Sequence, residues 1–215
     1  NPNCTFYDLL RISAESPAMI VFLDTVTSRG NSANIANENY ARELLELFTF
    51  GVDNGYDQND IVTTSRAWTG WSVEFVDAVN AANPFAPASV TLIPGSNSTL
   101  KVATVGTWAF NFKSANYGTN RAPIFPGKTV PARFGPPWAG ANYQLTLPPR
   151  SGTNGIQDGY DVLAHLANQP FTQEYICVKL CRLFVHDDFP NPTTNTDLPE
   201  YSFYDYTNPY RSAEA

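Results

Sequence analysis

The chain has 215 residues, of which 43% are hydrophobic and 15% charged, and its 13 Lys and Arg against 20 Asp and Glu give a formal charge of −7. This composition supplies a buried core and excludes an intrinsically disordered chain and a coiled coil. The low number of cations excludes a dense phosphate-binding surface, so we expect no nucleic acid as a partner.

Surface polarity must come mainly from neutral groups, because the chain holds 20 Asn, 20 Thr and 17 Pro. Such a surface is typical of a secreted or cell-envelope protein, and we expect a periplasmic or extracellular location. No run of about 18 apolar residues is present, so we expect no membrane span. The chain opens on Asn1 rather than Met, so we expect that a leader has been removed or that a longer chain has been cut.

Helices are predicted for the first third of the chain. An apolar turn covers 6–10, and Ser16 followed by Pro17 is typical of a helix start, which predicts a helix to residue 23. Residues 37–51 show the clearest helical period, with an N-cap at Asn37 and a stop at Gly51.

A further helix is predicted to begin at Asp57, where Asp60 stands at the third helical position as in a capping box, and to end near 69–71. From residue 73 onward Pro and Gly are frequent and alternation replaces the helical period. This pattern predicts strands over 90–93, 100–105 and 108–112, with a turn at 94–97.

Helical patterns return over 157–167 and 172–185, and the remainder is predicted to be extended. The expected fold is mainly α, a helical bundle interrupted by a β-rich, loop-rich insertion, and so α+β overall. The expected organisation is a helical core at 1–71 and 156–187, an insertion at 72–155 and an extended tail at 188–215.

The strongest polar pattern lies on the predicted helix at 37–51. Glu38, Arg42 and Glu46 are spaced i, i+4, i+8, and Glu43 flanks the arginine. One interpretation is an acid–base or cation-binding group of carboxylates. The favoured interpretation is a set of surface ion pairs, each worth about 0.3–0.5 kcal/mol.

Asp53, Asp57 and Asn59 alternate with other residues as the first ligands of a calcium loop do. The twelfth position, however, is Thr64 instead of the bidentate Glu. A capped turn is therefore the favoured interpretation, and we expect no metal and no other cofactor. His165 and His186 have no acidic or thiol partner at ligand spacing, so structural roles are expected for both.

Aromatic and thiol side chains give two weaker candidates. A carbohydrate-stacking platform would use the four tryptophans, Trp68, Trp71, Trp108 and Trp138, although most such side chains belong to cores. Cys4 can form a disulfide with Cys177 or Cys181, and three buried thiols are an equal alternative. Cys177 and Cys181 share one helical face, where core positions are favoured and a metal would need further ligands.

Residues 37–51, NENYARELLELFTFG, followed by Gly55-Tyr56 and by AWTGW at 67–71, closely resemble the signature of a bacterial family, the domain of unknown function 1800. CVKLCRLFV at 177–185 resembles a later helix of the same family. The resemblance implies an often exported protein without an established activity, whose domain usually extends further at both ends. A His-Asp pair of many members is missing from 114–120, SANYGTN.

The leading functional hypothesis is a non-catalytic structural or interaction subunit of an envelope or extracellular assembly, because motifs such as Gly-x-Ser-x-Gly and the Walker loop are missing. Its partners would be other protein chains or missing segments of the same protein. The alternative is a hydrolase that acts on a glycan or another polymer through Glu38, Arg42, Glu43 and Glu46. A carbohydrate-binding module that uses the tryptophans is a weaker alternative, and enzymatic activity is not the favoured reading.

Overall fold

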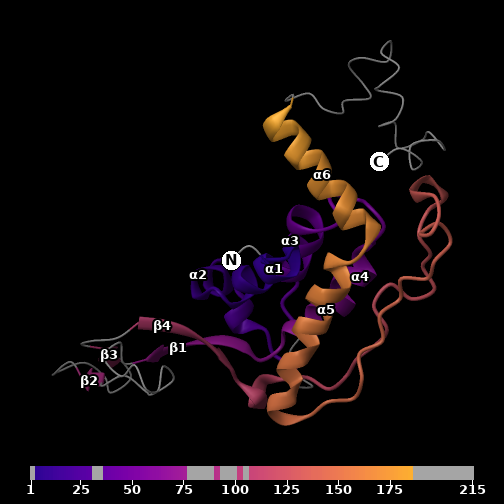
Figure 1. Ribbon diagram of the computed structural model, residues 1–215. Helices are drawn as coiled ribbons and strands as arrows, with labels where there is room; N and C mark the ends of the chain where they lie inside the picture. The colour runs from indigo at the N-terminus through magenta and orange to yellow at the C-terminus, as the bar shows by residue number, and fades with distance from the viewer. Residues whose placement is uncertain (1–2, 31–35, 77–89, 93–100, 104–106, 186–215) are drawn as a thin grey trace. The chain divides into compact units, whose positions relative to one another are not determined.

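The computed structural model describes residues 3–30, 36–76, 90–92, 101–103 and 107–185, and it is mainly α, as predicted (Figure 1). Its contacts divide the chain into two compact units. The first unit holds 1–40, 65–120 and 149–159, and the second holds 41–64, 121–148 and 160–215. The helices are α1 (Phe6–Glu15), α2 (Pro17–Phe22), α3 (Asn39–Glu43), α4 (Gln58–Ser65), α5 (Gln157–Ala167) and α6 (Pro170–Phe184). The strands are β1 (Trp71–Val76), β2 (Val90–Leu92), β3 (Lys101–Ala103) and β4 (Thr107–Phe112).

In the first unit α1 is longer than the turn predicted at 6–10. It begins at a capping box in which the Thr5 hydroxyl accepts from the Asp8 N–H at 3.3 Å and the Asp8 carboxylate accepts from the Thr5 N–H at 2.8 Å. Leu10 and Ala14, one turn apart, are buried along the helix. The cap and this apolar stripe together carry the helix to Glu15. α2 begins at Pro17, as predicted.

Two small antiparallel pairs make up the described sheet structure of the first unit. β1 pairs with β4, with Trp71 opposite Phe112 and Glu74 opposite Ala109, and β2 pairs with β3. The predicted strands over 90–93, 100–105 and 108–112 correspond to β2, β3 and β4. β1 was not predicted, because its start at Trp71 follows the preceding helical turn with only two residues between. The predicted turn at 94–97 and the tail at 188–215 lie outside the described residues.

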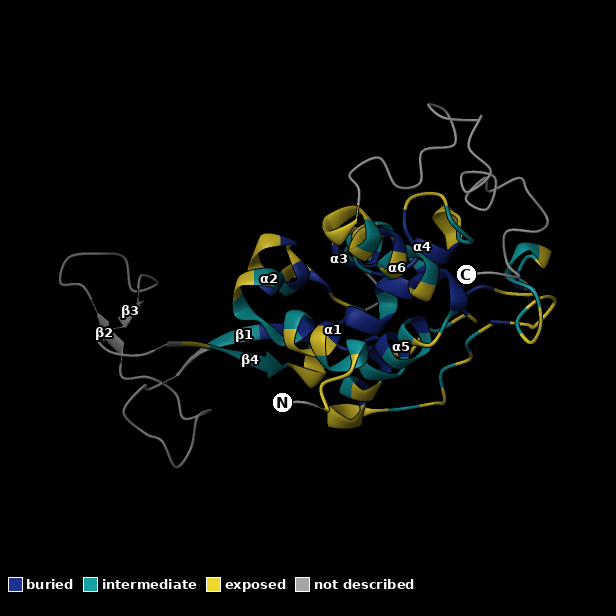
Figure 2. Ribbon diagram, turned by 45° about the horizontal axis from the view of Figure 1, so that its top comes forward, coloured by how far each residue is buried: buried dark blue, intermediate teal, exposed yellow. Residues whose placement is uncertain are grey.

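Aromatic side chains form the core of the first unit. The buried positions are dark blue on the ribbon of Figure 2. Trp68 and Trp71 are buried and meet edge to face with 4.9 Å between ring centroids, and Tyr40 lies edge-on to Trp68 at 4.6 Å. A Cβ at Gly159 would lie 2.4 Å from the Trp71 ring. Glycine at 159 therefore lets the start of α5 pack directly on these rings.

Two glycines of the first unit touch through their backbones. A Cβ at Gly30 would lie 2.1 Å from the Gly118 Cα, and a Cβ at Gly118 would lie 2.6 Å from the Gly30 Cα. The Gly30 N–H donates to the Asn116 carbonyl at 2.8 Å, which fixes this crossing. The segments before α3 and after β4 are joined here by main-chain contact.

The helix predicted over 37–51 is two elements. Asn37 accepts from the Asn39 N–H at 2.9 Å and α3 follows, but from Leu44 to Phe48 the chain is a π-helix. The Thr49 hydroxyl donates to the Leu44 carbonyl at 2.7 Å, so a side chain satisfies an acceptor of this wider turn. Gly51 ends the segment at φ +89°, as its predicted stop role requires.

The second unit is built around a cluster of stacked rings. The Phe50 ring lies 5.5 Å from that of Phe125 and 4.7 Å from that of Phe171, and Tyr143 lies 5.2 Å from Phe171. Phe171 stands in the first turn of α6, which begins at Pro170, two residues earlier than predicted. The cluster therefore joins the residues after the π-helix to the 121–148 segment and to α6.

Candidate functional site

The predicted carboxylate cluster around Arg42 is a loose surface arrangement. The Arg42 guanidinium lies 3.7 Å from a Glu46 carboxylate oxygen and donates to the Gln58 side-chain oxygen at 3.0 Å. The Arg42 side chain is 37% exposed and that of Glu46 27%. Glu38 precedes the first residue of α3, and Glu43 is its last residue.

The π-helix alters the helical face that the sequence predicts. The i, i+4, i+8 spacing gathers side chains only if one α-helix runs from 38 to 46, whereas α3 begins at Asn39 and the wider turn begins at Leu44. The arrangement of Arg42 with Glu46 corresponds to the surface ion pair of the favoured interpretation. Such a pair is worth about 0.3–0.5 kcal/mol.

The most concentrated charge group of the second unit lies at the start of α4. Asp57 and Asp60 form the predicted capping box: the Asp57 N–H donates to Asp60 at 2.8 Å, and the Asp60 N–H donates to Asp57 at 3.1 Å. Lys128, 68 residues further along the chain, donates to Asp60 at 2.5 Å and to Asp57 at 2.8 Å. One ammonium thus joins both cap carboxylates.

The electrostatics of this group favour the charged forms. The hydrogen bond from Lys128 lowers the pKa of the Asp57 carboxyl. Burial opposes the Lys128 charge, but the hydrogen bonds to both carboxylates outweigh it and raise the pKa of the ammonium. The Asp60 side chain is only 1% exposed, and its Oδ1 has no hydrogen bond. This arrangement holds a helix start in place.

The calcium-loop interpretation of Asp53, Asp57 and Asn59 finds no support in this geometry. Asp57 accepts from the Lys128 ammonium and from the Asn59 N–H, so its negative charge is already paired with a cation. Asp53 is exposed at φ +53° on the preceding turn. Within the described residues, no group of three or more His, Cys, Asp or Glu side chains is placed to hold a metal ion.

Arg133 forms a second charged contact of the second unit. It donates to the Asn54 side-chain oxygen at 2.5 Å, lies 3.4 Å from a Glu174 oxygen and stacks over the Phe134 ring at 4.4 Å. Both charged side chains are mostly buried, at 16% and 12% exposure. The guanidinium therefore ties the 121–148 segment to α6.

His165 has the structural role that the sequence predicts. Its Nε2 lies 2.8 Å from the Tyr143 carbonyl oxygen, and its ring stacks on Phe125 with 6.1 Å between centroids. Burial lowers the pKa of His165, and the hydrogen bond to the carbonyl offsets part of that effect. The neutral imidazole is therefore the favoured form. His186 lies outside the described residues.

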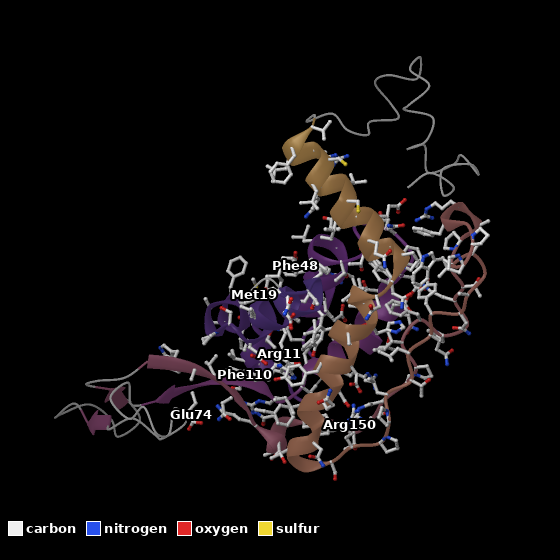
Figure 3. All side chains as sticks on the ribbon, in the orientation of Figure 1. Arg11, Met19, Phe48, Glu74, Phe110 and Arg150 are labelled. Carbon is white, nitrogen blue, oxygen red and sulfur yellow. The ribbon has the colours of Figure 1, made fainter. Side chains whose placement is uncertain are left out.

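The first unit holds a buried ion pair that the sequence did not reveal. Asp158, in the first turn of α5, is fully buried, and it accepts from the Tyr117 hydroxyl at 2.9 Å and from the Arg150 guanidinium at 2.7 Å. Figure 3 labels Arg150 beside this end of α5. Both carboxylate oxygens have a partner, so Asp158 is a cross-link rather than a reactive acid.

The four candidate tryptophans do not form one platform. Trp68 and Trp71 are buried in the first unit, Trp108 in β4 is 58% exposed, and Trp138 in the second unit is partly buried. Since the first two rings are core residues, they cannot stack on a sugar. The platform interpretation is wrong for Trp68 and Trp71.

All three cysteines are free thiols in the structure. Cys4 and Cys177 are exposed and Cys181 is partly exposed, so the expectation of buried core thiols is wrong. The described helices include none with the length and apolarity needed to cross a membrane, in agreement with the sequence.

Long-range partners were the residues that sequence reasoning missed. Lys128, Arg133, Glu174 and the Tyr117–Asp158 pair are joined to residues 41 or more positions away, and no local spacing marks them. The cap pattern Asp57-x-x-Asp60 could be predicted from the sequence, because both partners lie within one helical turn.

Comparison with known protein families identifies the family to which the chain belongs. Searches of curated proteins and of solved structures gave no match. The sequence model of the family described as "Protein of unknown function (DUF1800)" matches residues 3–201, nearly the whole chain. The chain therefore belongs to the DUF1800 family.

Proposed function

We propose that this chain is an exported bacterial protein that serves as a non-catalytic structural or interaction subunit of an envelope or extracellular assembly. Its partners would be other protein chains or further segments of the same protein, with no nucleic acid. One observation carries the proposal: the last two turns of α6 present a continuous apolar face to solvent. The finer architecture, a helical bundle interrupted by a β-rich insertion, is part of the same proposal.

The apolar face comprises Leu180, Leu183 and Phe184, which are 48%, 72% and 78% exposed. Their spacing of i, i+3, i+4 places them in one stripe. The helix packs on its other side through Val178, which is 8% exposed and lies about 140–240° away from the stripe at 3.6 residues per turn. Within the part of the chain that the structure describes, the helix is therefore apolar on two opposite faces, and the face that carries Val178 is the covered one.

Covering this face would provide a substantial driving force for association. Burying one large apolar side chain contributes about 1.5–3 kcal/mol, so three side chains supply several kcal/mol before the cost of association. A charged or phosphate-rich partner would not bury these apolar side chains and so would not gain this free energy. An apolar helix or strand face on another protein segment would use it.

The composition supports the location in this proposal. The chain is acidic, with four lysines and an abundance of Asn and Thr, which suits contacts between neutral surfaces outside the cell. The same composition gives no support to a nucleic-acid partner.

The two alternatives draw less support. A hydrolase that acts on a glycan or another polymer needs two facing carboxylates, whereas Arg42 is engaged with Glu46 and Gln58 on the surface. A carbohydrate-binding module needs exposed aromatic rings, and two of the four tryptophans are core residues.

The test is the mass of the native particle. The protein is purified from its own cells under mild conditions, and its mass is measured by light scattering. We expect a particle larger than a single chain, of which these 215 residues account for 23.7 kDa, and we expect Leu183→Glu/Phe184→Glu to dissociate it. Val52→Glu is the matched control, since Val52 is an isolated exposed residue at 63% exposure.

The control should leave the particle intact, and circular dichroism should show that both variants retain their helices. A monodisperse particle that holds a single chain and no partner would refute the proposal. So would a particle that persists unchanged when both apolar side chains carry a charge.

A further inference from the structure

We propose that Cys177 and Cys181 of α6 form a two-coordinate site for a soft monovalent metal ion, Cu(I). Both thiols are free, Cys177 is exposed, and Cys181 is partly exposed. The pair shares a helix face with Leu180 and Phe184 of the proposed assembly surface, but the test reads metal affinity and proton release, which are separate from the particle mass that tests assembly.

Helical geometry brings the two thiols together but keeps them from bonding to each other. α6 is regular up to its end, where the Val185 N–H donates to the Cys181 carbonyl at 2.8 Å. Side chains at i and i+4 stand above one another with about 5–6 Å between their Cβ atoms. A disulfide requires about 3.5–4.5 Å between the same atoms. The pair is thus too wide for a disulfide and spaced for an ion between the sulfurs.

The number of ligands decides which ion fits. A structural zinc site takes four ligands, and in the part of the chain that the structure describes no third His, Cys, Asp or Glu completes such a group. Thiolate sulfur selects Cu(I), which is stable with two ligands. Two thiolates therefore form a complete site for Cu(I) and an incomplete one for Zn(II).

The surroundings of the pair favour the same ion. Leu180 lies one turn after Cys177, and Phe184 lies at the same spacing from Cys181, and both are exposed apolar side chains of the helix. Neither offers an oxygen or nitrogen ligand. The Glu174 carboxylate, one turn before Cys177, is paired with Arg133. Binding converts two thiols and one Cu(I) into a bis-thiolate complex of charge −1 and releases two protons, with no change in oxidation state.

The experiment titrates the full, reduced chain with Cu(I) under anaerobic conditions against a chromogenic Cu(I) chelator. We expect one Cu(I) per chain, two protons released and no change in mass of the chain assembly. Cys177→Ser and Cys181→Ser should each weaken binding by on the order of 100-fold, because a single thiolate loses the second, pre-placed ligand. Cys4→Ser, which removes the distant exposed thiol, should leave affinity unchanged.

A positional control separates the proposed geometry from the mere number of thiols. Cys181→Ser/Leu180→Cys keeps two thiols on one face at i, i+3 and should retain Cu(I). Cys181→Ser/Arg182→Cys places the second thiol about 140° around the helix and should lose it. Helical circular dichroism should be equal in all variants, since every substituted position is at least partly exposed.

Three results would overturn the proposal: wild-type affinity in either single serine variant, equal retention by the 180 and 182 cysteine variants, or a stoichiometry of one Cu(I) per two chains. Tight Zn(II) binding at the same two residues would overturn the assignment of the ion.

Discussion

Among the described residues, each unit buries one carboxylate completely, and the two are satisfied in different ways. In the first unit both oxygens of Asp158 have a donor, one from Tyr117 and one from Arg150. In the second unit Asp60 shares one oxygen between Lys128 and the Asp57 N–H, while its Oδ1 has no hydrogen bond. Both residues are 0% exposed, so burial alone does not distinguish them.

The difference teaches what each carboxylate contributes. A buried charge stabilises the fold only if hydrogen bonds and charges from its partners replace the interactions with water that it loses on burial. Both oxygens of Asp158 accept a hydrogen bond and so link two other segments. Asp60 stabilises a helix start, but one of its oxygens accepts no hydrogen bond. Removing a partner of the buried carboxylate should therefore cost more in the first unit than in the second.

The largest effect is expected for Arg150→Met. It removes the Arg150 charge from the buried Asp158 carboxylate while the Tyr117 hydrogen bond stays, and such a loss costs about 3–5 kcal/mol in the free energy of unfolding. Urea denaturation followed by circular dichroism measures it. The double variant Arg150→Met/Asp158→Asn removes the uncompensated charge and should recover part of the loss. No recovery would mean that Arg150 acts through contacts other than Asp158.

A smaller loss, about 2 kcal/mol, is expected for Lys128→Met. The ammonium bridges two carboxylates, but its side chain is 26% exposed and Asp57 is 58% exposed, so water can replace part of the interaction. The same urea experiment measures it. A loss equal to that of Arg150→Met would remove the distinction between the two carboxylates.

Two adjacent threonines of α4 offer a matched pair with opposite signs. Thr64 is fully buried and its hydroxyl has no hydrogen bond, so Thr64→Val should raise the free energy of unfolding by up to about 1 kcal/mol. The Thr63 hydroxyl donates to the Asn59 and Asp60 carbonyls, so Thr63→Val should lower it by about 1 kcal/mol. Thermal unfolding of both variants checks the signs. A destabilised Thr64→Val would contradict the prediction that the Thr64 hydroxyl costs stability.

The smallest effect is a pH dependence from His165. Burial lowers its pKa in the folded protein, so between that value and about 6.5 the unfolded chain binds more protons than the folded one. The free energy of unfolding should therefore fall as the pH drops below about 6.5. The midpoints of urea denaturation between pH 5 and 7 give the slope of the free energy of unfolding against pH, and His165→Gln should reduce this slope. His186→Gln should leave it in place, and equal slopes in both variants would contradict the assignment.

Local patterns predicted most of the helical structure. The Ser16-Pro17 start, the Asp57–Asp60 cap and the limits of α5 depend on neighbouring residues, and the structure confirms them. The π-helix was not predictable, because the residues at Leu44–Phe48 fit an α-helix equally well and the Thr49 hydroxyl decides between the two.

The charged contacts depended on the fold instead. Glu38, Arg42 and Glu46 were selected by spacing, which predicts the Arg42–Glu46 pair. It does not predict that α3 begins at Asn39 and that a π-helix follows from Leu44. Asp158 was overlooked because Tyr117, 41 residues away, gives no sign of its partner in the sequence. The partners in such buried pairs are set by the topology of the fold, and local patterns in a single sequence do not reveal them.

The backbone contact between Gly30 and Gly118 has a consequence for how this family can vary. Each position has room for a side chain only if the other segment moves away, since the added Cβ would overlap the opposite Cα at 2.1 or 2.6 Å. Substitution of either glycine, or of both, would force the crossing apart. Across related chains the two positions should thus be inherited as one unit: glycine at both, or a rerouted crossing in which neither glycine is retained.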